Sequence, residues 1–301
     1  MTFSVTVLGC SAAIPVIQRF STAHLLQTDG RFFLFDCGEG TQIQLRRYGL
    51  SAMRIQCVFI SHMHGDHTFG LPGLLSTMGM NGRTEPLHLF GPAPLEGYMQ
   101  QVYAFFNPPE FEVVFHALPD QPQQIFEDKQ LTVSCFPLKH RIKTWGFRFE
   151  EKERLRNIRP DMIAYYQIPV RDIPGIKAGN DFVTEDGETI PNRKLTVPGI
   201  PARSYAFCSD TVYNEDMLPY IDGVDLLYHE ATYAADQTAR AAEVFHSTTA
   251  CAARIAAKAH AKQLMIGHYS AKYKELEPLL QEARAVFPNT ILAADGLTVK
   301  L

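Results

Sequence analysis

The chain has 301 residues, of which 46% are hydrophobic and 20% are charged, so it can bury a large core and wholesale disorder is excluded. Its net charge of −4 argues weakly against a nucleic-acid partner. The sequence shows no signal peptide, no apolar run long enough to span a bilayer, and six scattered cysteines without a CxxC pair. We therefore expect a cytoplasmic protein with reduced thiols.

The pattern of apolar and turn residues predicts many short strands and fewer helices. In chain order, strands are expected at residues 3–8, 24–27, 32–36, 56–60, 87–90, 112–115, 131–136, 205–208, 225–229 and 263–266. Helices are expected at residues 40–48, 71–78, 95–105, 248–259 and 275–287, with Ser247 as the N-cap of the fourth. The final residues, 290–293 and 297–301, read as a hairpin around Asp295-Gly296. Strands in runs favour a layered α/β sandwich over an alternating Rossmann sheet.

The stretch from residue 150 to residue 203 differs from the rest in composition. It is rich in Pro, Gly and charged residues and has little periodicity, so we interpret it as an insertion or arm without a core of its own. A solvated surface loop is the alternative. Residues 139–203 carry 13 Lys and Arg against 9 Asp and Glu, whereas the remainder carries 15 against 23. Basic charge is therefore concentrated in this part of the chain.

The most informative motif is HxHxDH at residues 62–67, directly after an apolar strand. Imidazole and carboxylate groups together suit zinc. His62 and His64 can project into one cavity, and Asp66 and His67, one turn later, can reach a second ion beside the first. Gly65 allows the tight turn between them. Four ligand-type residues within six positions predict a metal site.

Further ligands are needed to complete two metal sites, and three residues of the right type lie downstream. His140, Asp210 and His268 each follow a predicted strand. Asp210 could bridge two ions with its two carboxylate oxygens. This order of residues is similar to the metallo-β-lactamase pattern, which implies an αββα sandwich with the metals at one edge of the two sheets. Two zinc ions there would hold a hydroxide that attacks the substrate, oriented by Asp66.

The residues flanking the metal motifs narrow the resemblance. They are residues 35–42 (FDCGEGTQ), 67–75 (HTFGLPGLL), Lys139-His140 with 145–147 (WGF), 209–211 (SDT), 229–232 (HEAT), 246–248 (HST) and 267–270 (GHYS). Together they resemble the ribonuclease Z family, whose members remove the 3′ trailer from precursor tRNA. The resemblance covers essentially the whole chain.

The resemblance implies a set of roles for individual residues. His62, His64 and His140 would bind one Zn²⁺, and Asp66, His67 and His268 the other, with Asp210 bridging. Asp66 would also accept a proton, and Glu230 with His246 would form a carboxylate–imidazole pair near the leaving group. The implied protein is a zinc-dependent endoribonuclease and homodimer that cleaves precursor tRNA by metal-hydroxide attack. Its single metallo-β-lactamase domain, residues 1–301, would carry a substrate-binding arm at residues 151–203.

Two other functions remain open from the sequence. One is a metallo-β-lactamase-fold phosphodiesterase or sulfatase that acts on small esters, with the same metals and no need of the arm. The other is a non-catalytic binding or scaffold protein, which the complete ligand set argues against.

Overall fold

The structure is a computed structural model that describes residues 2–301. The chain divides into two compact units. The first comprises residues 1–127, 133–149 and 204–301, and the second comprises residues 128–132 and 150–203. Within residues 2–301, no helix is long and apolar enough to cross a membrane.

One seven-stranded sheet of the described chain has the order β18-β1-β2-β3-β4-β5-β6. Its strands are β1 (Phe3–Gly9), β2 (Ala23–Thr28), β3 (Arg31–Phe35), β4 (Ile55–Phe59), β5 (Leu87–Gly91), β6 (Val113–Ala117) and β18 (Thr298–Lys300). The pairs from β18 to β3 are antiparallel, and those from β3 to β6 are parallel. A hairpin turn at Asp29-Gly30 joins β2 to β3, with both turn residues at positive φ.

The second seven-stranded sheet has the order β17-β16-β15-β14-β9-β8-β7 within residues 2–301. Its strands are β7 (Gln123–Glu127), β8 (Leu131–Leu138), β9 (Thr144–Glu151), β14 (Ser204–Cys208), β15 (Leu226–Glu230), β16 (Gln263–Gly267) and β17 (Thr290–Leu292). Strands β14 to β17 run parallel to one another. The carboxyl ends of β14, β15 and β16 therefore lie at the same edge of this sheet.

Aromatic side chains fill the space between the two sheets. Phe35 of β3 lies 5.6 Å from Phe207 of β14 and 6.0 Å from Phe147 of β9, measured between ring centroids. Phe32 and Leu34, the alternate residues of β3, belong instead to the cluster that packs under the helices. Because successive strand residues point to opposite faces and both faces are covered, β3 reads as one continuous apolar run.

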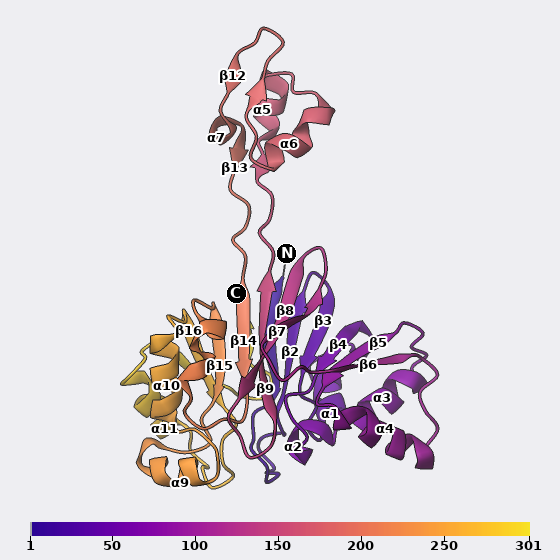
Figure 1. Cartoon of the computed structure of the whole chain (residues 1–301), viewed down its shortest axis with the longest axis vertical. Coiled ribbons are helices and arrows are strands. Elements are labelled where there is room, and N and C mark those ends of the chain that lie inside the picture. The colour runs from indigo at the N-terminus through magenta and orange to yellow at the C-terminus, as the bar shows by residue number, and fades with distance from the viewer. Residues whose placement is uncertain (1) are drawn as a thin grey trace. The chain divides into compact units, whose positions relative to one another are not determined.

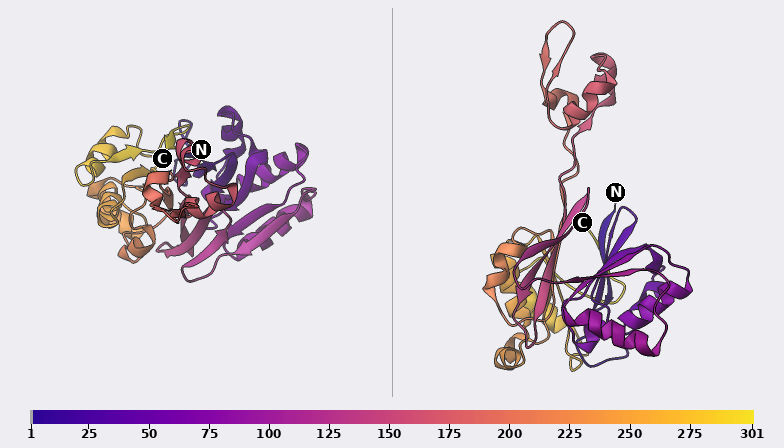
Figure 2. Two further views of the ribbon diagram at one scale, coloured as in Figure 1. Left: turned by 90° about the horizontal axis from the view of Figure 1, so that it is seen from above. Right: turned by 45° about the vertical axis from the view of Figure 1, so that its right-hand side comes forward.

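Helices cover the outer faces of both sheets (Figures 1 and 2). The first sheet carries α1 (Thr41–Arg47), α2 (Gly65–Thr68), α3 (Leu71–Met80) and α4 (Pro94–Phe105), and the second carries α8 (Leu218–Ile221), α9 (Thr238–Glu243), α10 (Thr249–Lys258) and α11 (Glu277–Arg284). Short 3-10 turns occupy Ala52–Arg54, Val170–Asp172, Glu215–Met217 and Ala235–Gln237. The predicted αββα sandwich is confirmed by two mixed sheets flanked by helices.

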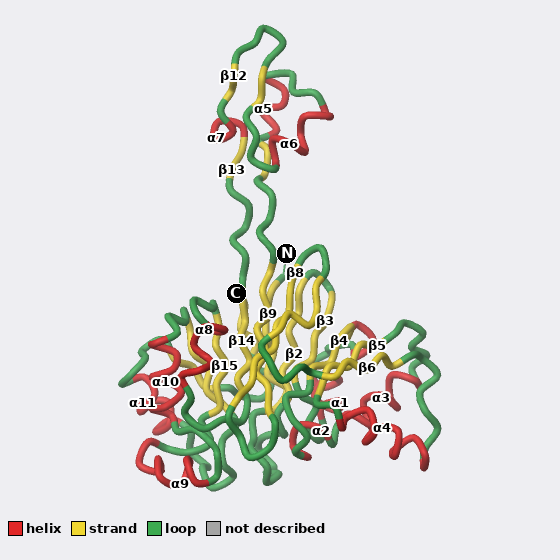
Figure 3. The backbone as a smooth tube through the Cα atoms, in the orientation of Figure 1, coloured by secondary structure: helices red, strands yellow, loops and turns green. Residues whose placement is uncertain are grey.

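The second unit is built from short elements joined by loops (Figure 3). They are β10 (Asn157–Ile158), α5 (Pro160–Tyr165), α6 (Ile173–Lys177), β11 (Phe182–Val183), β12 (Thr189–Ile190), α7 (Asn192–Leu195) and β13 (Thr196–Val197). The expectation that this stretch has no core was wrong. Ile168, Ile176, Phe182, Ile190 and Leu195 form a small buried cluster of their own. Their spacing follows no single period because each comes from a different short element.

Two local predictions near the C-terminal end were also wrong. Residues 290–301 do not form a hairpin, since β17 pairs with β16 in one sheet and β18 pairs with β1 in the other. The N-cap of α10 is Thr248 and not Ser247, because the Thr248 hydroxyl accepts from the backbone N–H of Cys251. The Ser247 hydroxyl donates to the carbonyl of Thr211 instead.

Candidate metal centre

Strand ends bring the predicted site residues of the first unit together. His62 lies three residues after β4, His140 and Asp210 each lie two residues after β8 and β14, Glu230 ends β15, and His268 follows β16. Ligand sites of open α/β sheets form where the carboxyl ends of strands meet. The fold thus gathers residues that are up to 206 positions apart in the sequence.

Three imidazoles and one carboxylate converge in a first donor group. The Nδ1 atom of His64 lies 3.0 Å from Nε2 of His62 and 3.3 Å from Nε2 of His140. Oδ2 of Asp210 lies 3.6 Å from Nε2 of His62 and 3.7 Å from Nε2 of His140. One donor atom of each residue lies within 4.8 Å of the other three. This spacing suits a shared cation.

A second donor group adjoins the first and shares Asp210 with it. Oδ2 of Asp66 lies 3.3 Å from Nε2 of both His67 and His268. The other oxygen of Asp210, Oδ1, lies 3.5 Å from Nε2 of His67 and 3.2 Å from Nε2 of His268. Each oxygen of Asp210 therefore faces a different donor group, which is the arrangement of a bridging ligand. Attraction to the neighbouring imidazoles outweighs burial and lowers the pKa of Asp210.

Four of the histidines share one orientation, with Nδ1 bonded to the protein and Nε2 facing the centre. Nδ1 lies 2.9 Å from Ser61 Oγ in His62, 2.7 Å from Asp36 Oδ2 in His67, 2.8 Å from the Phe245 carbonyl in His140, and 2.9 Å from Thr232 Oγ1 in His268. The Nε2 atom of His67 is buried without a hydrogen-bond partner among residues 2–301. Such orientation by an outer partner is typical of metal-ligating histidines, so the donor set fits a divalent metal.

Asp36 supports both donor groups and was missed by the sequence reasoning. Its Oδ2 accepts from Nδ1 of His67 at 2.7 Å and from the hydroxyl of Ser61 at 2.8 Å, and its Oδ1 accepts from the Ser61 backbone N–H at 2.7 Å. The side chain is fully buried, and the backbone sits at φ 55°, a strained value for a non-glycine residue. Its position directly after β3, in a motif already singled out, was the available signal.

Glu230 and His246 form a pair beside the two donor groups. Nδ1 of His246 donates to Oε1 of Glu230 at 2.8 Å, and it lies 4.0 Å from Oδ2 of Asp210. Glu230 is fully buried and also accepts from the backbone N–H groups of Thr211 and Thr232. Burial opposes the charge on His246, but the attraction of Glu230 outweighs it and raises the pKa of His246 to about 9. The pair can hold a proton on an imidazole that faces the cavity.

The donor groups and this pair open into one cavity of about 640 Å³. Its wall includes the loop of residues 12–15, Glu39 and Phe69 on one side, and Arg141, Tyr233 and His246. Five residues beyond that loop, the backbone N–H of Phe20 donates to Asp295 at 2.8 Å.

Comparison with known proteins identifies the family. The chain is 46% identical to proteins named ribonuclease Z from Parabacteroides distasonis and Bacteroides thetaiotaomicron, over 99% of this chain and 99% and 95% of theirs. The chain belongs to the ribonuclease Z family. The crystal structure of human tRNase Z, short form, resembles it with a TM-score of 0.72, 29% identity and 98% of each chain covered. The predicted family is therefore confirmed, and with it the enzyme class, a hydrolytic endoribonuclease.

Two further matches place the ribonuclease Z fold in a wider group. A metallo-β-lactamase fold protein from Bacillus subtilis matches with a TM-score of 0.71 and 20% identity, over 99% of each chain, which confirms the fold. A family model described as anti-Pycsar protein Apyc1 matches residues 3–155, so the chain is also related to that family. This stretch contains the HxHxDH motif and His140 but not Asp210, Glu230, His246 or His268.

Proposed function

We propose that the protein is a zinc-dependent endoribonuclease that removes the 3′ trailer from precursor tRNA. The observation that carries the proposal is the bridging position of Asp210 between two donor groups, with the Glu230–His246 pair beside them. Family membership and the likeness to human tRNase Z support the substrate. The buried free cysteines agree with a cytoplasmic location, which is part of the proposal.

The donor groups fit two ions, and we assign one to each. His62, His64 and His140 would hold the first, and Asp66, His67 and His268 the second, with Asp210 shared. Two bound zinc ions would supply a water of lowered pKa and would polarise a phosphate oxygen. Asp66 orients the attacking water, since its carboxylate lies at the cavity wall between His67 and His268.

His246 protonates the leaving group in this proposal. Cleavage that leaves a 3′-hydroxyl on the tRNA requires a proton on the departing ribose oxygen. His246 faces the cavity, and its Nδ1–H is held by Glu230, so its Nε2 is the atom that can deliver a proton to the substrate. Glu230 keeps the imidazole in that orientation and stabilises its charged form.

Replacing His246 by alanine is expected to lower turnover of precursor tRNA by about 10²–10⁴-fold, the usual contribution of a general acid. Zinc content should stay at the parental value. The loss should shrink on a nitrophenyl phosphodiester, because nitrophenolate departs without a proton. Steady-state kinetics on both substrates, with His260→Ala as an exposed histidine control, measure this difference. An equal loss on both substrates would show a structural role.

The alternative is a phosphodiesterase or sulfatase that acts on small esters, and the relation to the Apyc1 family gives it one observation in favour. Purified zinc-loaded protein should be offered a precursor tRNA with a 3′ trailer and a small chromogenic diester in parallel. The proposal expects site-specific release of the trailer at a kcat/KM far above that of the diester. Fast cleavage of the diester with an intact precursor tRNA would favour the alternative.

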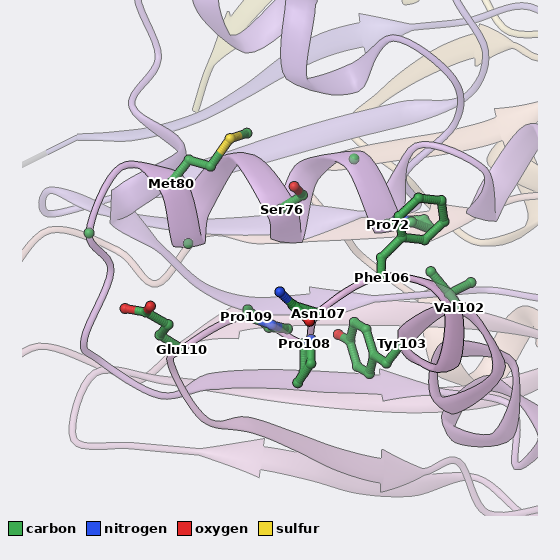
Figure 4. Close-up of a pocket in the computed structure, with 13 residues that line it drawn as sticks. Pro72, Ser76, Met80, Val102, Tyr103, Phe106, Asn107, Pro108, Pro109 and Glu110 are labelled. Carbon is green, nitrogen blue, oxygen red and sulfur yellow. The ribbon is translucent and has the colours of Figure 1, made fainter.

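We also propose that two copies pair through a groove between α3 and α4. The groove has a volume of about 800 Å³, with Pro72, Ser76 and Met80 on one wall and Val102, Tyr103 and residues 106–110 on the other (Figure 4). Met80, Phe105 and Phe106 expose 78%, 85% and 71% of their surface. Among the described residues that line the groove, Glu110 alone is charged, so a second copy of this face could bury it with little charge to desolvate.

Tyr103 adds a polar argument for a partner at this groove. Its hydroxyl is buried and has no hydrogen-bond partner within residues 2–301. A buried hydroxyl without a partner is costly, and a second chain would supply the missing acceptor. An RNA is a poor occupant, because no Lys or Arg lines the groove to meet its phosphates.

A Phe105→Glu substitution is expected to convert the dimer to a monomer, because two like charges would meet across a two-fold axis. We expect the dimer dissociation constant to rise by at least about 100-fold. Size-exclusion chromatography with light scattering measures the change, and Val183→Glu, at an exposed apolar residue of the second unit, is the control. A monomeric parent protein, or a dimeric Phe105→Glu variant, would refute this interface.

A further inference from the structure

The hydroxyl of Thr232 lies between a carboxylate and an imidazole of the site. Its Oγ1 is 2.7 Å from Oε2 of Glu230 and 2.9 Å from Nδ1 of His268. The residue is 3% exposed, and its backbone N–H also donates to Oε2 of Glu230 at 3.1 Å. Thr232 thus connects the pair that holds the proton donor to the second donor group.

The hydrogen-bond balance fixes the direction of both bonds. A carboxylate only accepts, so the single hydroxyl proton of Thr232 is donated to Glu230. The hydroxyl oxygen is then left to accept, and the proton in the second bond must come from Nδ1 of His268. A neutral imidazole protonated at Nδ1 has its lone pair on Nε2, the atom that lies 3.3 Å from Asp66 and 3.2 Å from Asp210.

The backbone of His268 has an unusual conformation, and its loop is tied to the loop of Thr232. His268 lies in a loop and has φ 58°, in the left-handed region that residues other than glycine seldom adopt. Two backbone bonds join that loop to the Thr232 loop: the Ala231 N–H donates to the Gly267 carbonyl at 2.8 Å, and the Ser270 N–H to the Thr232 carbonyl at 3.2 Å. The loops are therefore held together, and Thr232 Oγ1 is the hydrogen-bond partner that holds Nδ1 of the His268 ring.

The first donor group repeats this arrangement with other residues. There the Ser61 hydroxyl donates to Asp36 at 2.8 Å and lies 2.9 Å from Nδ1 of His62. Each carboxylate thus holds one imidazole directly, His67 or His246, and a second through a hydroxyl. The repetition indicates that the hydroxyl links are built features of the site.

We propose that Thr232 is a positioning residue that fixes His268 as a metal ligand through Nε2 and couples it to the Glu230–His246 pair. The metal-ligand part rests on geometry alone, and the coupling to proton donation rests on the function proposed above. Losing the hydroxyl frees the His268 ring to turn or to exchange its proton between nitrogens. It also removes one of the bonds that hold the Glu230 carboxylate toward His246.

The test compares Thr232→Val, which keeps the shape and removes the hydroxyl, with Thr232→Ser, which keeps the hydroxyl. Zinc affinity is measured by competition with a chromophoric chelator on the full chain. For Thr232→Val, one of the two ions should bind about 10–100-fold more weakly, and Thr232→Ser should remain within a few-fold of the parent. Thr290→Val removes a buried hydroxyl bonded to a backbone carbonyl far from the metal ligands and is the matched control.

A direct spectroscopic measurement keeps the inference testable even if Thr232→Val folds poorly. Proton–nitrogen correlation spectra of ¹⁵N-histidine-labelled zinc protein report which ring nitrogen of His268 carries hydrogen. The proposal requires Nδ1–H in the parent and in Thr232→Ser. A hydrogen on Nε2 in the parent, or parental zinc affinity in a folded Thr232→Val, would overturn it.

Kinetics separate this inference from the proposed function. At saturating zinc, Thr232→Val should lower kcat on precursor tRNA with little change in KM, because it disturbs His246 and not RNA binding. Parental kcat under these conditions would refute the coupling. A parent protein that binds zinc as described but leaves precursor tRNA uncut would refute the function and leave the role of Thr232 at His268 intact.

Discussion

An Asp66→Ala variant is expected to lose hydrolysis of every phosphodiester, by at least about 10³-fold in kcat, while the protein still folds. The reason is positional. The carboxylate of Asp66 lies 3.3 Å from the Nε2 atoms of His67 and His268 and lines the cavity, so it contacts both the second donor group and the space for the attacking water. In the proposed mechanism, removing it takes away a metal ligand and the group that orients the nucleophile.

Two measurements make this prediction strict. Activity is assayed at saturating zinc on precursor tRNA and on a chromogenic diester, and both should fall together because Asp66 serves the chemistry and not substrate choice. Far-UV circular dichroism checks the fold, and Asp222→Ala, at an exposed carboxylate bonded to His260, is the control. Near-parental turnover by Asp66→Ala would remove Asp66 from the mechanism.

Replacing residues 154–194 with a short Gly/Ser linker is expected to lower kcat/KM on precursor tRNA by at least about 100-fold, equivalent to roughly 2.8 kcal/mol of binding free energy. We propose that residues 151–203, expected from the sequence to be a substrate-binding arm, bind the tRNA body, and this exchange removes most of them. Hydrolysis of the small diester should stay within a few-fold of the parent, since this substrate has no tRNA body for the arm to bind. If the shortened chain cleaves precursor tRNA at the parental rate, residues 154–194 are a surface loop without a role in substrate binding.

The excess of basic residues expected in the arm lies outside the second unit. Residues 150–203 carry 9 Lys and Arg and 9 Asp and Glu, so the second unit as a whole is neutral. Glu151 pairs with both Arg154 and Arg203 within the unit. The excess expected from residues 139–203 comes from Lys139, Arg141, Lys143 and Arg148, which belong to the first unit.

Arg193 and Lys194 of α7 are the cations of the second unit best suited to RNA. Both are exposed, and neither has an acidic partner among the described residues. If each contacts a phosphate, the linker variant should show a salt dependence of log KM shallower by about two than that of the parent. An unchanged slope would place the tRNA contacts elsewhere.

The clustering of the candidate metal residues could be predicted because the residue types that bind metals concentrate in one motif and at strand ends. His62, His64, Asp66 and His67 lie within six positions, and the other members follow apolar strands whose ends a layered sheet must bring together. The residues that orient them were not found. Asp36 contacts His67, and Thr232 contacts His268, each from a loop distant in the sequence. Asp and Thr are common residue types, so their presence alone does not indicate this supporting role.

The errors in the fold have a similar origin. Residues 290–301 have the turn signal and strand propensities of a hairpin, and local sequence cannot tell whether two adjacent strands pair with each other or with distant neighbours. The small core of the second unit was missed because its five members come from different short elements. In both cases contacts between distant residues decide the structure.

The division of β17 and β18 between the two sheets also affects the order of folding. β18 pairs Thr298, Val299 and Lys300 with Thr6, Val5 and Ser4, so the first strand of the chain has a vacant edge until the last strand has been made. Asp295, between β17 and β18, accepts from the backbone N–H of Phe20 at 2.8 Å. Contacts of such long sequence separation form slowly. Until β18 has been synthesised, β1 therefore keeps an unpaired edge and the backbone of Phe20 lacks its bond to Asp295.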